Sequence, residues 1–151
     1  MTTIIVVDRL TKMAHFIPFR CLPTTSIAAC SLISNIFKLH GFPDFIISDR
    51  GSQFTSGFWN RLCNLLDIAH SLSISNNPET DGQTERMNGI MEQYLRCFIN
   101  ERQNNWVDFL PFPEFDYNNT LHQSINQSPF FTIFGFNPKF SPEIPSSERL
   151  S

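Results

Sequence analysis

A short apolar run that stops at a carboxylate is the feature that most constrains this chain. Residues 45–48 read FIIS, and Asp49-Arg50-Gly51 follows them directly. A run of this kind is typical of a strand buried on both faces in a parallel sheet. Asp and Gly are also common turn residues, so a plain turn would explain Asp49 equally well. The two interpretations differ in whether a second carboxylate lies at a suitable place further along the chain.

The segments around this run predict an α/β layered domain. We expect strands at residues 3–7 and 13–19, joined as a hairpin, and another at residues 70–75. The expected helices follow Pro23–Ser26, span about 56–67, and continue from residue 83 to 103, from 111 to 121 and from 129 onward. Early strands, then strands alternating with helices, then helices alone indicate a mixed sheet covered by helices.

Three local signals refine these helices. An approximately helical apolar stripe ends at His40-Gly41 and is formed by Ile27, Cys30, Ile33, Phe37 and Leu39. Ser128 suits an N-cap and Pro129 the first helical position of the last helix. Pro113 is tolerable only if it lies with Pro111 in the first turn of its helix.

The composition is that of an ordinary soluble globular chain, with 41% hydrophobic and 17% charged residues. Its 151 residues are enough for one domain with a proper core. No apolar run approaches the roughly 18 residues of a membrane span, and no N-terminal stretch reads as a signal peptide, so we expect no membrane partner. Four widely spaced cysteines favour buried free thiols in a reducing compartment over disulfides or a zinc site: Cys21, Cys30, Cys63 and Cys97.

The formal net charge of −3 counts against a domain that holds nucleic acid by bulk electrostatics. Such domains usually carry a basic patch. Any contact with DNA must therefore depend on a local site or on other parts of a larger protein. The four histidines (His15, His40, His70 and His122) show no metal-ligand spacing, and we interpret them as core-edge or surface residues.

Glu85 is the candidate for the second carboxylate. It lies in the first turn of the long helix predicted from residue 83, where the helix dipole favours a negative charge. A plain capping or dipole role is the alternative for Glu85.

Two-metal phosphoryl chemistry requires a cluster of carboxylates, and oxygen ligands suit Mg²⁺. A strand end and a helix start that face the same edge of a sheet can supply such ligands, and positions 50 through 84 separate Asp49 from Glu85.

Several segments of the chain, taken together, closely resemble the integrase core of gypsy-type LTR retrotransposons. The resemblance covers residues 3 to 140 and is carried by VVDRLTKMAHFIP, SDRGSQFTSGFW, ETDGQTERMN, EQYLRCFIN and NNWVDFLPFPEFDYNNTLHQS. It implies a ribonuclease-H-like three-layer fold with a mixed central sheet, and a triad of two aspartates and a glutamate that binds Mg²⁺ or Mn²⁺. It also implies 3′-end processing and strand transfer of DNA. Asp49 matches the second aspartate of the triad, and Glu85 matches the glutamate.

The first aspartate of the triad has no match in this chain. The family places it on a first strand, upstream of the stretch that resembles Val-Val-Asp-Arg-Leu-Thr-Lys. Asp8 belongs by the resemblance to the end of the second strand, where we expect turn contacts or contacts with Arg9. The resemblance thus leads us to expect a core at residues 1–140 that lacks the first strand, with an incomplete two-ion site and little activity. Residues 141–151 are expected to form a flexible tail.

The same resemblance suggests DNA contacts and partners. Gln83, Arg86 and Asn88 flank Glu85 at positions that face DNA in relatives, and Lys12 could meet a phosphate. Ordinary solvent-exposed polarity is the alternative for each. The implied partners are the DNA of the element ends, target DNA and further copies of the chain, in a nuclear or intracellular setting and without a small-molecule substrate.

Two other functions compete with an integrase core. The chain could be a non-catalytic remnant that serves as a DNA-contact or dimerisation module. It could also be a small α/β enzyme that uses Asp49 and Glu85 for general acid–base work, although the context of the DRGSQF motif disfavours this. A reading frame with an aspartate on an upstream strand would favour the enzyme over the remnant.

Overall fold

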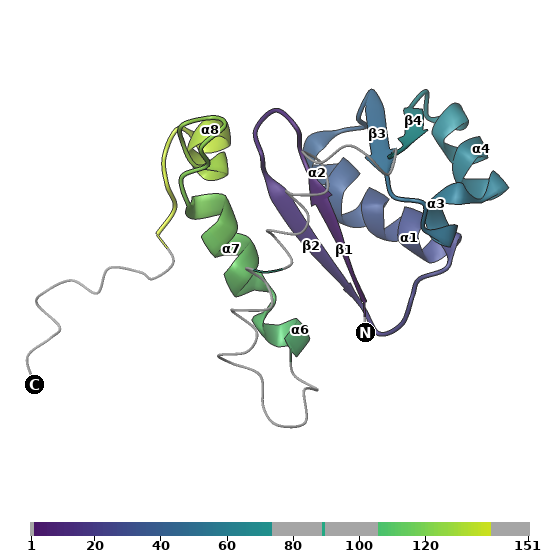
Figure 1. The fold of residues 1–151 in the computed structure, drawn as a ribbon, viewed down its shortest axis with the longest axis horizontal. Helices are drawn as coiled ribbons and strands as arrows, with labels where there is room; N and C mark the ends of the chain where they lie inside the picture. Colours follow the sequence, from purple (N-terminus) through teal and green to yellow (C-terminus); the bar gives the residue numbers. More distant parts are fainter. Residues whose placement is uncertain (1, 74–88, 90–105, 140–151) are drawn as a thin grey trace, which may run out of the picture. The chain divides into compact units, whose positions relative to one another are not determined.

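The computed structural model of the chain describes residues 2–73, 89 and 106–139 (Figure 1). The chain divides into two compact units. The first comprises Met1–Ile5 and His15–Asn88, and the second comprises Val6–Ala14 and Gly89–Ser151. No helix in the described ranges is long and apolar enough to cross a membrane.

The first two strands form the hairpin that the sequence predicts. Strand β1 (Thr2–Val7) pairs with β2 (Ala14–Phe19) in a two-stranded sheet. Asp8 closes the turn between them, because its backbone N–H donates to the Met13 carbonyl at 2.8 Å and its Oδ2 accepts from the Thr11 backbone N–H and hydroxyl at 3.0 and 2.5 Å. The expected turn role of Asp8 is thus confirmed.

A nearly continuous helical segment follows the hairpin and ends where the sequence indicates. It consists of α1 (Thr25–Leu32), the π-helical turn η1 (Ile33–Phe37) and α2 (Lys38–His40). The Thr24 side chain caps the start by accepting from the Ile27 backbone N–H. Gly41 ends it with a φ of 81°, a conformation that a residue without Cβ adopts without strain.

The apolar stripe predicted for this segment is largely wrong. The buried residues are Ala28, Ala29, Leu32, Ile36 and Phe37. Phe37 is therefore the one residue of the predicted stripe that is buried. The exposed residues include Cys30 and Ile33, as well as Ile27 and Leu39, whose exposed fractions are 52% and 61%. Apolar side chains occur on several sides of this segment. Helix α1 packs against α3 and α4, and two of its three buried residues are alanines. Small side chains permit close packing between helices. The spacing of large apolar residues does not reveal that a helix buries its alanines.

The next two strands form a parallel pair. Strand β3 (Phe45–Ser48) pairs with β4 (Ala69–Leu72), with Ile46 opposite His70 and Ser48 opposite Leu72. The connection runs through α3 (Ser52–Thr55) and α4 (Gly57–Leu65), and α4 packs against β4 (Figure 1). Parallel strands require such a crossover.

The expectation that β3 is buried on both faces is wrong. Phe45 is 46% exposed, and the other three residues of the strand are half-buried. In the described part of the chain β4 is the one strand that pairs with β3. One edge of β3 therefore has no strand beside it among these residues.

The expected buried thiols are confirmed for one cysteine only. Cys63 is buried in α4, whereas Cys21 and Cys30 are exposed, and all three are free. Cys97 lies outside the described residues.

The second unit contains three described helices: α6 (Trp106–Phe109), α7 (Pro111–Asn119) and α8 (Pro129–Phe134). Ser128 caps α8 by accepting from the Phe131 backbone N–H at 3.0 Å, and Pro129 occupies its first turn, as expected. Pro113 lies buried in the first turn of α7, where proline is compatible with a helix. Helices α7 and α8 pack through Phe115 and Phe130, whose ring centroids are 5.3 Å apart.

A buried amide ties α7 to the start of β2. Asn118 is 1% exposed, and its Oδ1 accepts from the Ala14 backbone N–H at 2.9 Å. Its Nδ2 donates to the Ala14 carbonyl at 2.8 Å. The side chain thus satisfies both backbone groups of one residue at a strand edge, as a neighbouring strand would.

Two predicted segments lie outside the described residues. The first is the long helix with Gln83, Glu85, Arg86 and Asn88, of which only Gly89 is described. The second is the tail at residues 141–151. The predictions for both remain predictions.

Candidate metal-binding site at the end of β3

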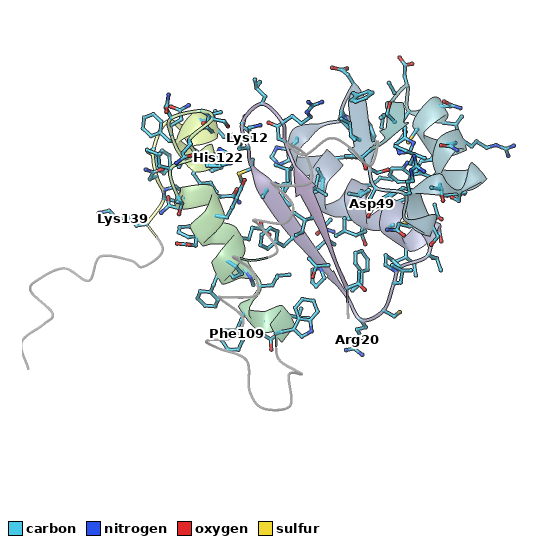
Figure 2. All side chains as sticks on the ribbon, in the orientation of Figure 1. Lys12, Arg20, Asp49, Phe109, His122 and Lys139 are labelled. Carbon is cyan, nitrogen blue, oxygen red and sulfur yellow. The ribbon has the colours of Figure 1, made fainter. Side chains whose placement is uncertain are left out.

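Asp49 directly follows the carboxyl end of β3 and is exposed (Figure 2). Its Oδ1 accepts a hydrogen bond from the Gly51 backbone N–H at 3.0 Å, a local turn that aspartate side chains commonly make. No residue in the described part of the chain donates to its Oδ2. Among the described residues, the carboxylate is thus held through one oxygen only.

Glycine at position 51 leaves space in this turn for the Gln53 amide, and its backbone conformation does not require glycine. Its φ of −56° and ψ of 142° are accessible to any residue. A Cβ at this position, however, would lie 2.5 Å from Gln53 Nε2 and 2.8 Å from Gln53 Cδ. Gln53 is only 8% exposed, so its amide packs directly over the turn.

A second hydrogen-bonded group lies on β3 and β4. The Ser48 hydroxyl donates to the Asp49 carbonyl at 3.1 Å, and it lies 2.8 Å from His70 Nε2. The His70 ring makes an edge contact with Trp59, with centroids 5.9 Å apart. Burial lowers the pKa of His70 below its ordinary value, because desolvation disfavours the charged ring.

The residues predicted to form the site are only partly described. Asp49 lies at the strand end as expected, whereas Glu85, Gln83, Arg86 and Asn88 lie outside the described residues. Within residues 2–73, 89 and 106–139, no group of three His, Cys, Asp or Glu side chains could hold a metal ion. The convergence of Asp49 and Glu85 therefore remains a prediction.

Lys12 lies in the turn of the β1–β2 hairpin. It is half-buried and has a φ of 63°, and its backbone N–H donates to the Asp8 carbonyl at 2.9 Å. Lys12 belongs to the second unit and Asp49 to the first. Its role as a DNA contact remains a prediction.

The chemistry of Asp49 fits one ligand of a hard divalent ion. Mg²⁺ prefers oxygen ligands and usually keeps several waters while one or two carboxylates hold it. An exposed carboxylate with one anchored oxygen meets this requirement. Sequence reasoning overlooked Gln53 and the Ser48–His70 pair, because only the register of β4 against β3 reveals that His70 lies near Ser48.

Comparisons with known proteins show that the chain is similar to transposon polyproteins. No family model matches it. It is 34% identical over 143 residues to the Transposon Tf2-3 polyprotein of Schizosaccharomyces pombe, and equally to the Transposon Tf2-4 polyprotein of that organism. Each alignment covers 94% of the chain and 11% of the polyprotein. The chain therefore spans about a tenth of the length of these relatives.

Solved structures of viral proteins share its fold. A structure of the simian T-cell lymphotropic virus intasome in complex with PP2A regulatory subunit B56 gamma matches with a TM-score of 0.69 and 23% identity, over 97% of this chain and 52% of that one. The HTLV-2 integrase catalytic core domain in complex with magnesium matches with a TM-score of 0.66 and 18% identity, over 85% and 81%. The BIV integrase catalytic core domain gives 0.62 and 19%, over 85% and 82%.

Proposed function

Because the chain has the ribonuclease-H-like fold of retroviral integrase catalytic cores and is related along nearly its whole length to transposon polyproteins, we propose that it is the core domain of a retrotransposon integrase. Its chemistry is then the processing of the 3′ ends of element DNA and their joining to target DNA. The observation that supports this most directly is Asp49, an exposed carboxylate at the carboxyl end of a parallel strand.

Asp49 and Glu85 are the proposed ligands of Mg²⁺ or Mn²⁺. When bound, such an ion stabilises the charge that develops on the attacking and leaving oxygens of a phosphoryl transfer. Asp49 contributes an anchored carboxylate, because the Gly51 N–H restricts its orientation. The family triad has three carboxylates and this chain matches two, so we propose that the two-ion site needs a further acidic ligand.

The proposed partners are DNA and further copies of the chain. Gln83, Arg86, Asn88 and Lys12 are the proposed DNA contacts, and the net charge of −3 requires that such contacts be local. Support for assembly comes from the neighbours, which include an intasome and both dimeric and trimeric forms of the HTLV-2 core. Integration into chromosomal DNA would require a nuclear location.

Binding of Mn²⁺, followed by paramagnetic broadening of NMR signals, tests the metal site. Asp49→Asn and Glu85→Gln should each weaken binding about tenfold or more, since each removes an anionic ligand. Asp44→Asn is the matched control, because Asp44 is an exposed carboxylate that directly precedes β3. Unchanged Mn²⁺ affinity in Asp49→Asn would refute the metal role of Asp49.

Strand transfer on a short DNA duplex tests the chemistry. We expect little or no joining by the 151-residue chain with either ion. A misplaced ion loses several kcal/mol of transition-state stabilisation, and about 1.4 kcal/mol corresponds to a tenfold change in rate. A chain extended by a strand that carries an aspartate should recover joining, and Glu85→Gln in that chain should abolish it.

The alternative is a non-catalytic module that contacts DNA or dimerises. That alternative predicts DNA binding without Mn²⁺ binding at Asp49 and without joining by the extended chain. Robust joining by the 151-residue chain would contradict an incomplete site and would assign the third ligand to another of its own acidic residues.

A further inference from the structure

A chain of two hydrogen bonds connects β4 to the strand end that carries Asp49. His70 Nε2 lies 2.8 Å from Ser48 Oγ, and Ser48 Oγ donates to the Asp49 carbonyl at 3.1 Å. His70 pairs with Ile46 in the parallel register, two residues before Ser48. Residues two apart on a strand point to the same face, so the imidazole reaches the hydroxyl diagonally across that face. All of these residues belong to the first unit.

The direction of these bonds follows from the number of hydrogens. A serine hydroxyl has one hydrogen, and Ser48 uses it on the Asp49 carbonyl. On this assignment, the hydroxyl oxygen accepts from the imidazole. His70 is thus assigned the tautomer with its proton on Nε2, and the order of donation is His70 to Ser48 to Asp49.

The position of the imidazole is fixed by its packing. Trp59 meets the ring with centroids 5.9 Å apart and an interplanar angle of 80°. Trp59 is itself 1% exposed and lies in the first turn of α4, which Ser56 caps. The donor at Nε2 is therefore held by a rigid indole and by the pairing of β4 with β3.

Asp49 is then held at two separate points. The hydrogen bonds from His70 to Ser48 and from Ser48 to Asp49, which we call the relay, hold the Asp49 carbonyl oxygen and limit rotation about its ψ. The Gly51 N–H holds one oxygen of the Asp49 carboxylate. We propose that His70 and Ser48 are positioning residues that orient the Asp49 carboxylate toward a divalent ion. The orientation toward an ion rests on the proposed function, whereas the effect of the relay on the turn does not.

The first test needs no metal. The ¹⁵N chemical shifts of the His70 ring should show a protonated Nε2, and a ring protonated at Nδ1 alone would overturn the relay. Amide hydrogen exchange of Gly51 should become about three- to tenfold faster in Ser48→Ala and in His70→Phe, because a hydrogen bond contributes roughly 0.5–1.5 kcal/mol. Phenylalanine keeps a ring against Trp59 but has no donor.

Rescue by a conservative change separates positioning from packing. His70→Gln restores an N–H donor near the position of Nε2 without an aromatic ring, so Gly51 exchange should return toward the wild-type rate. Ser71→Ala is the matched control, because Ser71 lies on β4 and is exposed, and its side chain points to the opposite face from His70. Equal effects of His70→Phe and His70→Gln would overturn the proposal.

The second test measures Mn²⁺ affinity in the same variants. We expect Ser48→Ala and His70→Phe to weaken binding about three- to tenfold, with His70→Gln and Ser71→Ala near wild type. If the wild type binds Mn²⁺ and the relay variants bind it equally well, the positioning role is wrong. If Gly51 exchange responds as expected but the wild type binds no Mn²⁺, the relay stands and the proposed metal site fails.

Discussion

A side chain at position 51, in the turn after β3, would contact the Gln53 amide. Because its backbone conformation is open to any residue, the constraint comes from the Gln53 amide that packs over it. We expect Gly51→Ala to lower the free energy of unfolding by about 1 kcal/mol, the low end of the cost of overpacking, since a flexible amide end can shift. Urea unfolding measures this.

The control for that substitution is Gly57→Ala. Nothing lies within 4 Å of a Cβ at Gly57, which begins α4, so the variant should stay within about 0.5 kcal/mol of wild type or gain stability. If Gly51→Ala unfolds at the wild-type urea concentration, Gln53 does not constrain the turn.

Asn118 satisfies two backbone groups at once, so its loss should be costly. In Asn118→Leu, the N–H and carbonyl of Ala14 lose their hydrogen-bond partners, and Ala14 itself is buried. We expect a loss of about 2 kcal/mol or more, since each buried unsatisfied group costs roughly 1–3 kcal/mol. Asn64→Ala, an exposed position on α4, should change the free energy of unfolding by less than about 0.5 kcal/mol. Equal losses would contradict the role of Asn118.

The cysteines should differ in reactivity. Burial raises the pKa of the Cys63 thiol, which suppresses the reactive thiolate, whereas Cys21 and Cys30 are exposed. In the native protein, Cys21→Ser and Cys30→Ser should each remove one equivalent of rapidly reacting thiol in an Ellman assay. Cys63→Ser should remove one equivalent only in denaturant, and a loss of a fast equivalent in this variant would show that Cys63 is accessible.

At the level of elements, the start of α4 depends on its cap. Ser56 Oγ accepts from the Trp59 backbone N–H at 3.2 Å, and Ser56 has an extended backbone that separates α3 from α4. We expect Ser56→Ala to cost about 1 kcal/mol of unfolding free energy in urea denaturation. Ser52→Ala, at the start of α3, is the control, because Ser52 is exposed and lies where no side-chain cap is formed. A cost as large for Ser52→Ala would argue against capping by Ser56.

The elements whose ends carry local signals could be predicted from the sequence. The β1–β2 hairpin, the stop at Gly41 and the start of α8 at Ser128 and Pro129 depend on residues close together in the chain. The face that an element buries depends on its partners instead. For that reason the stripe on α1 was wrong and β3 proved more exposed than an apolar run indicates.

The same distinction applies to the candidate site. Asp49 could be predicted because a strand signal and a turn signal meet at one position. The relay could not, because Ser48 and His70 are 22 residues apart and meet only through strand register. Register is set by pairing in three dimensions, which no local pattern specifies.

For the whole molecule, His70 makes stability depend on pH. Its pKa is lowered by burial from the ordinary value of 6.5, which the unfolded chain regains. As pH falls below about 6.5, the unfolded state therefore binds more protons than the folded state, and stability decreases until pH passes the lower folded pKa. His70→Gln should lose less stability than wild type between about pH 8 and pH 5.5 in urea denaturation. An unchanged pH profile would contradict desolvation of the ring.

The hairpin that contributes to both units has a consequence for the order of folding during synthesis. The start of β2 joins α7 through Ala14 and Asn118, which are 104 positions apart. During synthesis, β2 leaves the ribosome long before α7. The N–H and carbonyl of Ala14 therefore lack their partner until Asn118 has been made. Contacts between distant positions slow folding, and exposed strand edges promote aggregation in the interval. The emerging chain is therefore expected to be most prone to aggregation between the release of β2 and the synthesis of Asn118.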